Sequence, residues 1–288
     1  MVDIAAPGSH HESTTMTDHH HDKGLAHDLK IFAARMNRRH LLRLTVGALS
    51  ATAVGCGDST ADDDTGDTGD ADETGSSPTG GGACSAIPEE TAGPYPGDGT
   101  NGANALVLTG IVRSDIRQSI GDASGTAEGV SLTVTLTVVD ETCAPRAGHA
   151  VYLWHCNRDG AYSMYSGSAS AENYLRGVQE TDADGKVTFQ TIFPAAYSGR
   201  WPHIHFEVYP SLAEANDAGN KLRTSQLAMP EGACDEVFAI AGYEQSVQNL
   251  ATSSLATDNV FSDGSSLQVA DVSGDTTAGY VAALTVAV

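Results

Sequence analysis

Residues 193–208 read FPAAYSGRWPHIHFEV, and the fold of the chain is best understood by working outward from them. Apolar and polar residues alternate from position 203 to position 208, which is the pattern of a β-strand. Side chains two residues apart on a strand point to the same face. The rings of His203 and His205 are therefore expected to lie side by side, close enough to bind one metal ion.

A phenol and a guanidinium precede the two histidines. Tyr197 and Arg200 lie in a turn-like segment that contains Gly199 and is bounded by Pro194 and Pro202. Two strand histidines with separate hydrogen bonds would account for the His-x-His motif alone. The gathering of these four functional side chains in so short a stretch favours a metal site instead.

The chain is acidic, and its acidity is unevenly spread. It has 288 residues and a formal net charge of -22, a length that suits one or two domains. Nucleic-acid binding requires a basic surface, so the charge argues against that class. Residues 58–73 contain eight acidic and no basic side chains. This stretch also lacks large apolar residues, so we expect residues 57–83 to form a disordered tether.

Residues 36–55 have the organisation of an export signal. Arg38 and Arg39 precede an apolar run at 44–55 that is too short for an ordinary membrane span. The arginine pair resembles a twin-arginine signal, which is an address read by a receptor. We assign residues 1–35 no function, because Met36 fits the start of translation better.

Residues 53–56 resemble a lipoprotein cleavage box with Cys56 as the acylated residue. Residues 1–56 are thus expected to be leader and signal, with the mature protein periplasmic or at the cell surface and held by a lipid. A plain cleaved signal, with Cys56 an incidental thiol, is the alternative.

The four other cysteines fall in the region that we expect to fold. They are Cys84, Cys143, Cys156 and Cys234. An even number in an exported domain predicts two disulfides, and three connectivities remain open. A metal site made of cysteines alone is disfavoured, because no close Cys-x-x-Cys pair occurs.

Residues 84–288 have the composition of one globular all-β domain. Strands are predicted at 105–112, 130–139, 150–155, 186–193, 203–209, 222–228, 266–272 and 280–288, with one short helix at 235–243. Strands separated by turn residues, with no recurring helix between them, indicate an antiparallel β-sandwich.

Three ordered motifs resemble the intradiol ring-cleavage dioxygenase family, whose members include catechol and protocatechuate dioxygenases. The motifs are WHCNRDGAYS at 154–163, RGVQETDADG at 176–185 and FPAAYSGRWPHIH at 193–205. The similarity covers residues 89–288. The loop between Tyr197 and His203 is short, and no helical dimerisation domain precedes the core, which is typical of the exported, single-domain branch of the family.

The resemblance implies a β-sandwich-like core and specific roles for individual residues. The implied ligands of a ferric ion, Fe(III), are Tyr162, Tyr197, His203 and His205. The implied catalytic groups are Arg200 beside the substrate, Tyr197 as the base that leaves the metal, and Gln226 as a supporting glutamine. The implied substrate-pocket residues are Thr91, Pro94 and Tyr95.

The activity implied is cleavage of a catechol-type aromatic by O2 between its two oxygenated carbons, giving a cis,cis-muconate-type diacid outside the cytoplasm. Two phenolates are hard oxygen donors and favour ferric iron. One alternative is a non-catalytic, tethered β-sandwich binding module that retains the scaffold. Another is a zinc or copper site, which two tyrosinates make less favourable for zinc.

For several single residues, alternative roles outside the metal site remain open. Tyr165 is a rival of Tyr162 in the same turn. Arg200 has Glu207 or Asp182 as a possible ion-pair partner, and Glu207 shares the alternating face of the histidines. Trp154 and Cys156 are expected to serve packing and a disulfide, respectively.

Overall fold

The structure is a computed structural model, and it describes residues 83–288. The predicted export signal, Cys56 and nearly all of the predicted tether lie outside these residues. Within the described part, no helix combines the length and the apolar character needed to cross a bilayer.

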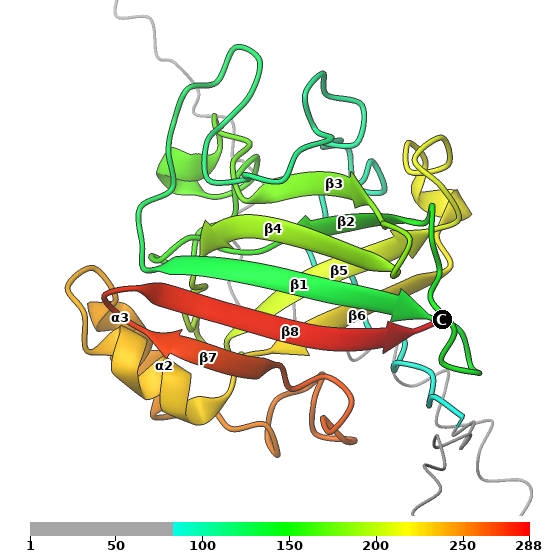
Figure 1. Cartoon of the computed structure of the whole chain (residues 1–288). Helices are drawn as coiled ribbons and strands as arrows, with labels where there is room; N and C mark the ends of the chain where they lie inside the picture. Colours follow the sequence, from blue (N-terminus) through cyan, green and yellow to red (C-terminus); the bar gives the residue numbers. More distant parts are fainter. Residues whose placement is uncertain (1–82) are drawn as a thin grey trace, which may run out of the picture. The chain divides into compact units, whose positions relative to one another are not determined.

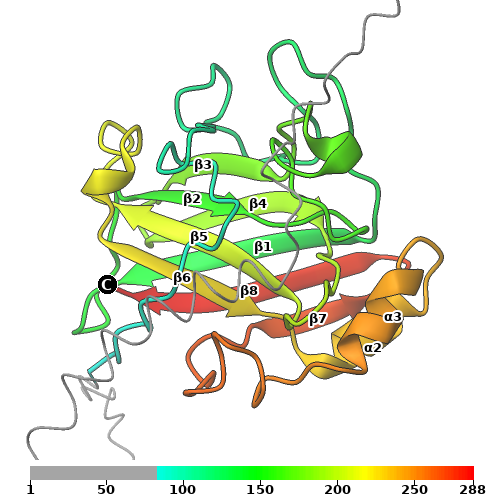
Figure 2. The same ribbon diagram turned by 180° about the vertical axis from the view of Figure 1, so that it is seen from behind.

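Two four-stranded sheets pack face to face and form a β-sandwich (Figures 1 and 2). The strands are β1 (Ser131–Val139), β2 (Ala150–Trp154), β3 (Arg176–Glu180), β4 (Lys186–Ile192), β5 (His203–Tyr209), β6 (Arg223–Ala228), β7 (Asp271–Asp275) and β8 (Gly279–Ala287). The first sheet has the order β4-β1-β8-β7 and the second has the order β3-β2-β5-β6. The predicted all-β sandwich is confirmed, except that β1 and β8 pair in parallel within an otherwise antiparallel fold.

The core between the sheets follows from strict alternation. In β1, Leu132, Val134 and Leu136 are fully buried, and intervening threonines are partly exposed. From the other sheet, Ile204 and Phe206 of β5 join the same hydrophobic cluster. Burying side chains on one face of each sheet is the main source of stability in such a sandwich.

The second sheet is buried on both faces, unlike a typical antiparallel sheet. Every residue of β2 and β5 is buried. The outer side chains Tyr152 and Trp154 pack under a layer of loops that includes Leu106, Ile111 and Tyr162. Polar residues on this outer face, His203 and His205 among them, are therefore held away from bulk water.

Several predicted elements differ from the structure. Residues 105–112 are not a strand: successive turns close through Leu108 N to Ala105 O and Ile111 N to Leu108 O, and only Val112 makes a bridge. β3 was not predicted, because its sequence RGVQE shows no apolar alternation, although its first three residues are buried. β7 begins at Asp271, so most of the strand predicted at 266–272 is loop.

Helical structure is limited to short elements. The helix predicted at 235–243 is replaced by α2 (Glu231–Phe238) and α3 (Glu244–Leu250), which lie beside β7 (Figure 1). Two 3-10 turns, η1 (Gly167–Ala169) and η2 (Ala218–Asn220), belong to the loops. Phe238 of α2 closes one end of the core against Phe193, with ring centroids 6.1 Å apart.

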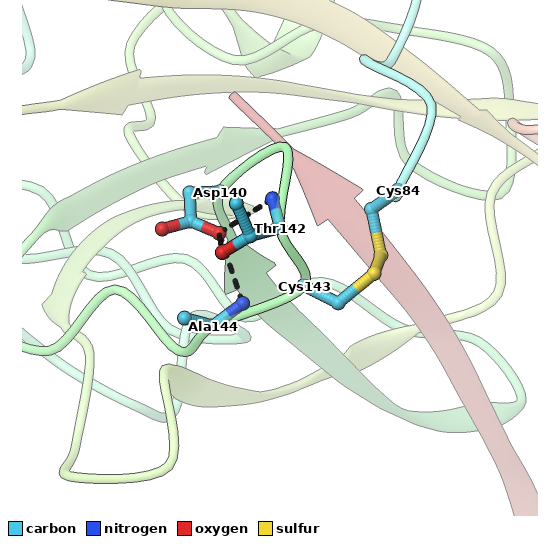
Figure 3. Close-up of a disulfide and its surroundings, with 5 residues drawn as sticks. All are labelled: Cys84, Asp140, Thr142, Cys143 and Ala144. Carbon is cyan, nitrogen blue, oxygen red and sulfur yellow. Dashed lines mark hydrogen bonds between the residues drawn. A yellow bond between two sulfur atoms is a disulfide. The ribbon is translucent and has the colours of Figure 1, made fainter. Parts of the chain in front are cut away.

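One disulfide is present among the described residues, between Cys84 and Cys143 (Figure 3). The Asp140 side chain accepts hydrogen bonds from the Thr142 and Ala144 amides and so shapes the turn that carries Cys143. This bond ties the start of the folded domain to the end of β1.

The prediction of a second disulfide was wrong. Cys156 and Cys234 are buried free thiols. Cys156 belongs to the cluster outside the second sheet, whereas Cys234 lies on α2 in the core between the sheets. The second sheet's packing therefore separates the two thiols, and each behaves as a small apolar residue.

Replacing both Cys84 and Cys143 by serine is expected to lower the free energy of unfolding by about 4 kcal/mol, because the bond closes a long loop in the unfolded chain. The loop joins positions 59 residues apart. Denaturant titration of variant and wild type measures the difference. Wild type in excess reductant serves as the control and should match the variant; a loss below about 1 kcal/mol would contradict the loop argument.

Candidate metal centre

Four side chains bring their donor atoms together over the outer face of the second sheet. His203 and His205 are the first and third residues of β5, Tyr197 precedes them in the turn, and Tyr162 follows β2. The two Nε2 atoms are 3.1 Å apart. The Tyr162 hydroxyl lies 3.5 Å from His203 Nε2, 3.2 Å from His205 Nε2 and 3.5 Å from the Tyr197 hydroxyl. The Tyr197 hydroxyl lies 3.1 Å from His203 Nε2.

These separations suit donors around a single transition-metal ion. Four nitrogen or oxygen atoms at about 2.1 Å from a tetrahedral centre lie about 3.4 Å from one another. Within residues 83–288, no three His, Cys, Asp or Glu side chains make such a group. The centre therefore depends on the two phenols as much as on the imidazoles.

Both imidazole rings are fixed by their surroundings. His203 Nδ1 lies 2.5 Å from the Trp201 carbonyl oxygen, so it donates there and leaves the Nε2 lone pair towards the other donors. The His205 ring stacks on Trp154, with centroids 4.9 Å apart and planes 6° from parallel. His205 Nδ1 has no hydrogen-bond partner among the described residues, so stacking holds this ring.

Two glycines let the surrounding loops approach the donors. Gly93 has a φ of +73°, and a Cβ there would lie 3.4 Å from His205 Cε1. Gly160 has a φ of +80°, and a Cβ there would lie 3.1 Å from Tyr197 Cβ. Since other residues rarely adopt such φ values, both positions favour glycine on conformational grounds, and the tighter approach at Gly160 adds a steric one.

Burial sets the protonation of the four donors. Burial, reinforced by the nearby Arg200, holds the pKa of His203 well below its ordinary value, and burial with the neighbouring His203 does the same for His205. Burial raises the pKa of Tyr197 to about 12, and burial also raises the pKa of Tyr162 well above its ordinary value. The imidazoles are thus neutral and able to bind metal at pH 7, and the phenols lose their protons only to a strong Lewis acid.

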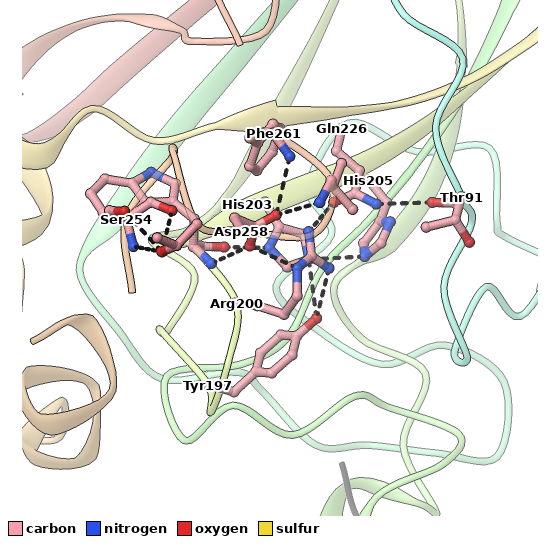
Figure 4. Close-up of polar contacts among 12 residues, drawn as sticks. Thr91, Tyr197, Arg200, His203, His205, Gln226, Ser254, Asp258 and Phe261 are labelled. Carbon is pink, nitrogen blue, oxygen red and sulfur yellow. Dashed lines mark hydrogen bonds and ion pairs between the residues drawn. The ribbon is translucent and has the colours of Figure 1, made fainter. Parts of the chain in front are cut away.

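Arg200 is aimed at the donors by two side chains (Figure 4). Its Nε donates to Asp258 Oδ2 at 2.9 Å, and its Nη2 donates to Gln226 Oε1 at 2.6 Å. Its Nη1 lies 3.5 Å from the Tyr197 hydroxyl and 3.3 Å from His203 Nε2. One edge of the guanidinium is therefore anchored to the protein, and the remaining nitrogen faces the centre.

Asp258 is the residue of this site that sequence reasoning missed. It is buried in the loop after α3, and its carboxylate also accepts hydrogen bonds from the Trp201, Val260 and Phe261 amides. No motif marks the position. The available signal was indirect: a buried arginine is commonly paired with a carboxylate.

The predicted substrate-pocket residues lie in a segment that crosses β6 and β5 (Figure 2). The Thr91 carbonyl oxygen accepts a hydrogen bond from Gln226 Nε2 at 2.9 Å, so one glutamine joins this segment to Arg200. The Tyr95 ring centroid is 5.1 Å from that of Tyr162. Pro94, between them, is exposed.

The structure distinguishes between the interpretations left open for single residues. The Tyr165 hydroxyl binds Asn101 and the Gly97 amide, away from the donor group. Glu207 accepts hydrogen bonds from Lys221 and Tyr209, so it pairs with neither Arg200 nor the histidines. Asp182 shapes its own turn by accepting from the Asp184 and Lys186 amides.

Glu90→Gln is expected to stabilise the protein more at pH 8 than at pH 5. Burial, with Asp263 close by, raises the pKa of Glu90 from 4.5 to about 7. A carboxyl with a raised pKa in the folded protein has no effect on stability below its pKa in the unfolded chain. Above its pKa in the folded protein, the full energetic cost of ionising it in place is present. The melting-temperature gain should grow by about 2 °C between these pH values, because solvent screens a half-buried charge. Glu89→Gln, at an exposed neighbour, is the control; an equal gain at both pH values would contradict the prediction.

Comparisons with known proteins agree with this geometry. A family model described as Dioxygenase matches residues 111–213. A catechol 1,2-dioxygenase of Acinetobacter lwoffii is 39% identical over 61 residues, which is 21% of this chain and only 22% of that protein's length. An intradiol ring-cleavage dioxygenase of Tetranychus urticae has a similar structure, with a TM-score of 0.53 and 28% identity, over 71% of this chain and 94% of the other.

The fold, the ordered motifs and these likenesses point to one class of protein. The chain is similar to the intradiol ring-cleavage dioxygenases, over residues 111–213 in sequence and over 71% of its length in structure.

Proposed function

We propose that the protein cleaves a catechol-type aromatic between its two hydroxylated carbons, using O2 and ferric iron, to a cis,cis-muconate-type diacid. The observation that carries the proposal is the donor group: Tyr162, Tyr197, His203 and His205 have neighbouring donor atoms 3.1–3.5 Å apart. The similarity to intradiol ring-cleavage dioxygenases supports the reaction type.

These residues fit iron better than zinc or copper. Two neutral imidazoles and two phenols become a set with two negative charges once the phenols ionise, which suits a hard trivalent cation. Bound ferric iron would act as a Lewis acid that orients the two catechol oxygens and favours their ionised form.

Tyr197 is the phenol placed to take a proton from the incoming catechol. It is only partly buried, whereas Tyr162 is enclosed between Tyr95 and His205. Burial raises the pKa of Tyr197 to about 12, although the positive charge of Arg200 opposes the rise. A basic phenolate at the accessible edge of the site can accept a proton, and Tyr162 can remain in place.

Arg200 supplies a fixed positive charge beside the reacting ring. Its Nη1 is the guanidinium nitrogen that faces Tyr197 and His203, because the opposite edge is held by Asp258 and Gln226. A donor that is already oriented stabilises negative charge developing on the substrate without further reorganisation.

The deciding experiment measures metal content, visible absorption and oxygen uptake of the purified full chain. With iron bound we expect a red-brown protein, from charge transfer between tyrosinate and iron, that consumes O2 with catechol, protocatechuate or hydroxyquinol. A colourless protein with stoichiometric zinc would refute the proposal. A coloured protein that consumes no O2 with any catechol would favour the non-catalytic binding module.

We further propose that the protein acts outside the cytoplasm, held by a lipid on Cys56. The support is the signal-like sequence at 36–56 together with the Cys84–Cys143 disulfide, since such bonds persist in oxidising compartments. Fractionation of cells carrying Arg38→Lys with Arg39→Lys should find the protein retained in the cytoplasm, and Cys56→Ser should release it from the membrane fraction. Unchanged location in both would refute this part.

A further inference from the structure

The electrostatics of the site indicate which ring substituents a catechol can carry. The basic side chains that contact the histidine donors, the Tyr95 segment or Glu207 are Arg200, Arg176 and Lys221, respectively. A carboxylated substrate would need one of them to be available for its anionic group, because a buried, unpaired carboxylate is strongly disfavoured.

Arg200 is already committed to other partners. Asp258 is buried and accepts its Nε at 2.9 Å, so one edge of the guanidinium is held in an ion pair. Gln226 takes Nη2 at 2.6 Å. The remaining nitrogen, Nη1, faces Tyr197 and His203, where the proposed function assigns it to the charge that develops on the reacting ring.

Arg176 is satisfied entirely by neutral groups of the protein. It is almost wholly buried, and its nitrogens donate to the Tyr95, Pro96 and Ser163 carbonyl oxygens and to the Tyr152 and Ser163 hydroxyls. A substrate anion could reach it only by breaking these bonds, which hold the Tyr95 segment over the sheet.

Lys221 is committed to two acidic side chains. Its Nζ lies 2.9 Å from Glu207 Oε1 and 3.7 Å from Asp98 Oδ2. Both carboxylates are buried. If any of these three cations paired with a substrate carboxylate, it would have to leave its present partner. That partner is a buried carboxylate or carbonyl oxygen, which would then be unpaired.

Glu90 adds a negative group beside the same site. Its amide donates to the Thr224 carbonyl of β6, and the next residue, Thr91, is bonded to Gln226. Its half-buried carboxyl accepts a hydrogen bond from Gln268 Nε2 at 3.4 Å, and no basic side chain of residues 83–288 forms an ion pair with it. The ionised carboxylate of Glu90 is therefore not neutralised by an ion pair with these residues.

We propose that Glu90 is a specificity-determining residue that, together with the committed cations Arg176, Arg200 and Lys221, restricts the enzyme to catechols without an anionic ring substituent. The inference rests on the proposed function and names the substrate class of that site. Like charges brought together in a poorly hydrated site repel strongly, and this repulsion discriminates between substrates.

The test compares 4-methylcatechol with 3,4-dihydroxybenzoate, which differ chiefly in one carboxylate. With the iron-loaded full chain at pH 8, we expect kcat/KM for the benzoate to be about 100-fold lower, because repulsion from Glu90 adds to the cost of burying a carboxylate that no cation is free to pair with. Dissociation constants from visible titrations under anaerobic conditions should show the same order, independently of turnover.

Charge substitution at Glu90 identifies the cause. Glu90→Gln should narrow the ratio of the two kcat/KM values by about five-fold to tenfold, and Glu90→Lys should narrow it further. Glu89→Gln is the matched control: it removes the same charge one position away, from an exposed side chain paired with Arg223, and should leave the ratio unchanged.

The outcomes separate this inference from the proposed function. Comparable kcat/KM values for the two catechols in the wild type would overturn the substrate class and leave ring cleavage intact. An unchanged ratio of these kcat/KM values in both Glu90 variants would do the same. Failure to turn over or bind either catechol would overturn the proposed function and this inference with it.

Discussion

Tyr162→Phe is expected to lower the affinity for ferric iron by more than about 100-fold, because the change deletes a ligand and even residues behind a ligand contribute 10–100-fold. Catalysed oxygen uptake should fall with the iron content, and the remaining visible band should weaken and shift. The hydroxyl that is lost lies 3.2 Å from His205 Nε2 and 3.5 Å from His203 Nε2. Iron titration followed by absorption measures the effect, and fluorescence of Trp154, stacked on His205, gives a second readout.

Tyr165→Phe is the matched control, because it removes a hydroxyl from the same turn. That hydroxyl binds Asn101 and the Gly97 amide, so its loss should leave iron affinity within about twofold. If Tyr162→Phe kept full affinity and colour, Tyr162 would be a packing residue and the four-donor centre would be wrong. Equal losses in both variants would point to the turn as a whole instead of one ligand.

Periodicity was sufficient to locate the histidine pair. The strand predicted at 203–209 coincides with β5, because alternation on a sheet buried between two layers leaves little freedom of register. The same alternation correctly separated Ile204 and Phe206, which face the core, from His203 and His205. Tyr162 is different: nothing in its own pattern distinguishes it from Tyr165, and only family resemblance favoured it before the structure placed its hydroxyl beside the histidines.

The parts of the site that were not predicted depend on contacts between distant segments. Asp258 meets Arg200 across 58 positions, and the loop that carries it has no periodic pattern. β3 was overlooked because Arg176 is polar, yet the protein buries it by supplying carbonyl and hydroxyl acceptors. Counting cysteines failed for a related reason: Cys156 and Cys234 lie in separate clusters on opposite sides of one sheet.

These contacts also explain why the outer face of the second sheet, and not the core, carries the candidate metal centre. The core is filled by apolar side chains from both sheets, whereas the outer face is covered by loops from different parts of the chain. Loops can deliver a phenol, a carboxylate or an arginine to a rigid strand from several directions. The histidines of β5 supply the half of the centre that a strand holds, and the loops supply the two phenols.

Arg200→Lys is expected to lower kcat by about 100-fold while iron content and colour are retained, because losing one oriented donor to developing charge has an effect of this size. Lysine keeps the positive charge, so the buried Asp258 is not left unpaired, but a single ammonium cannot bind Asp258 and Gln226 and still reach the substrate. The side chain should therefore stay with Asp258, and KM should change less than kcat.

Steady-state oxygen uptake combined with iron analysis measures this effect, and Arg158→Lys is the control. Arg158 forms its ion pair with the exposed Glu128, so its replacement should leave kcat unchanged. A kcat within threefold of wild type in Arg200→Lys would show that charge alone is enough and that the anchoring by Gln226 and Asp258 is incidental. Loss of iron would instead assign Arg200 to the support of Tyr197 and His203, because its free nitrogen lies within 3.5 Å of both.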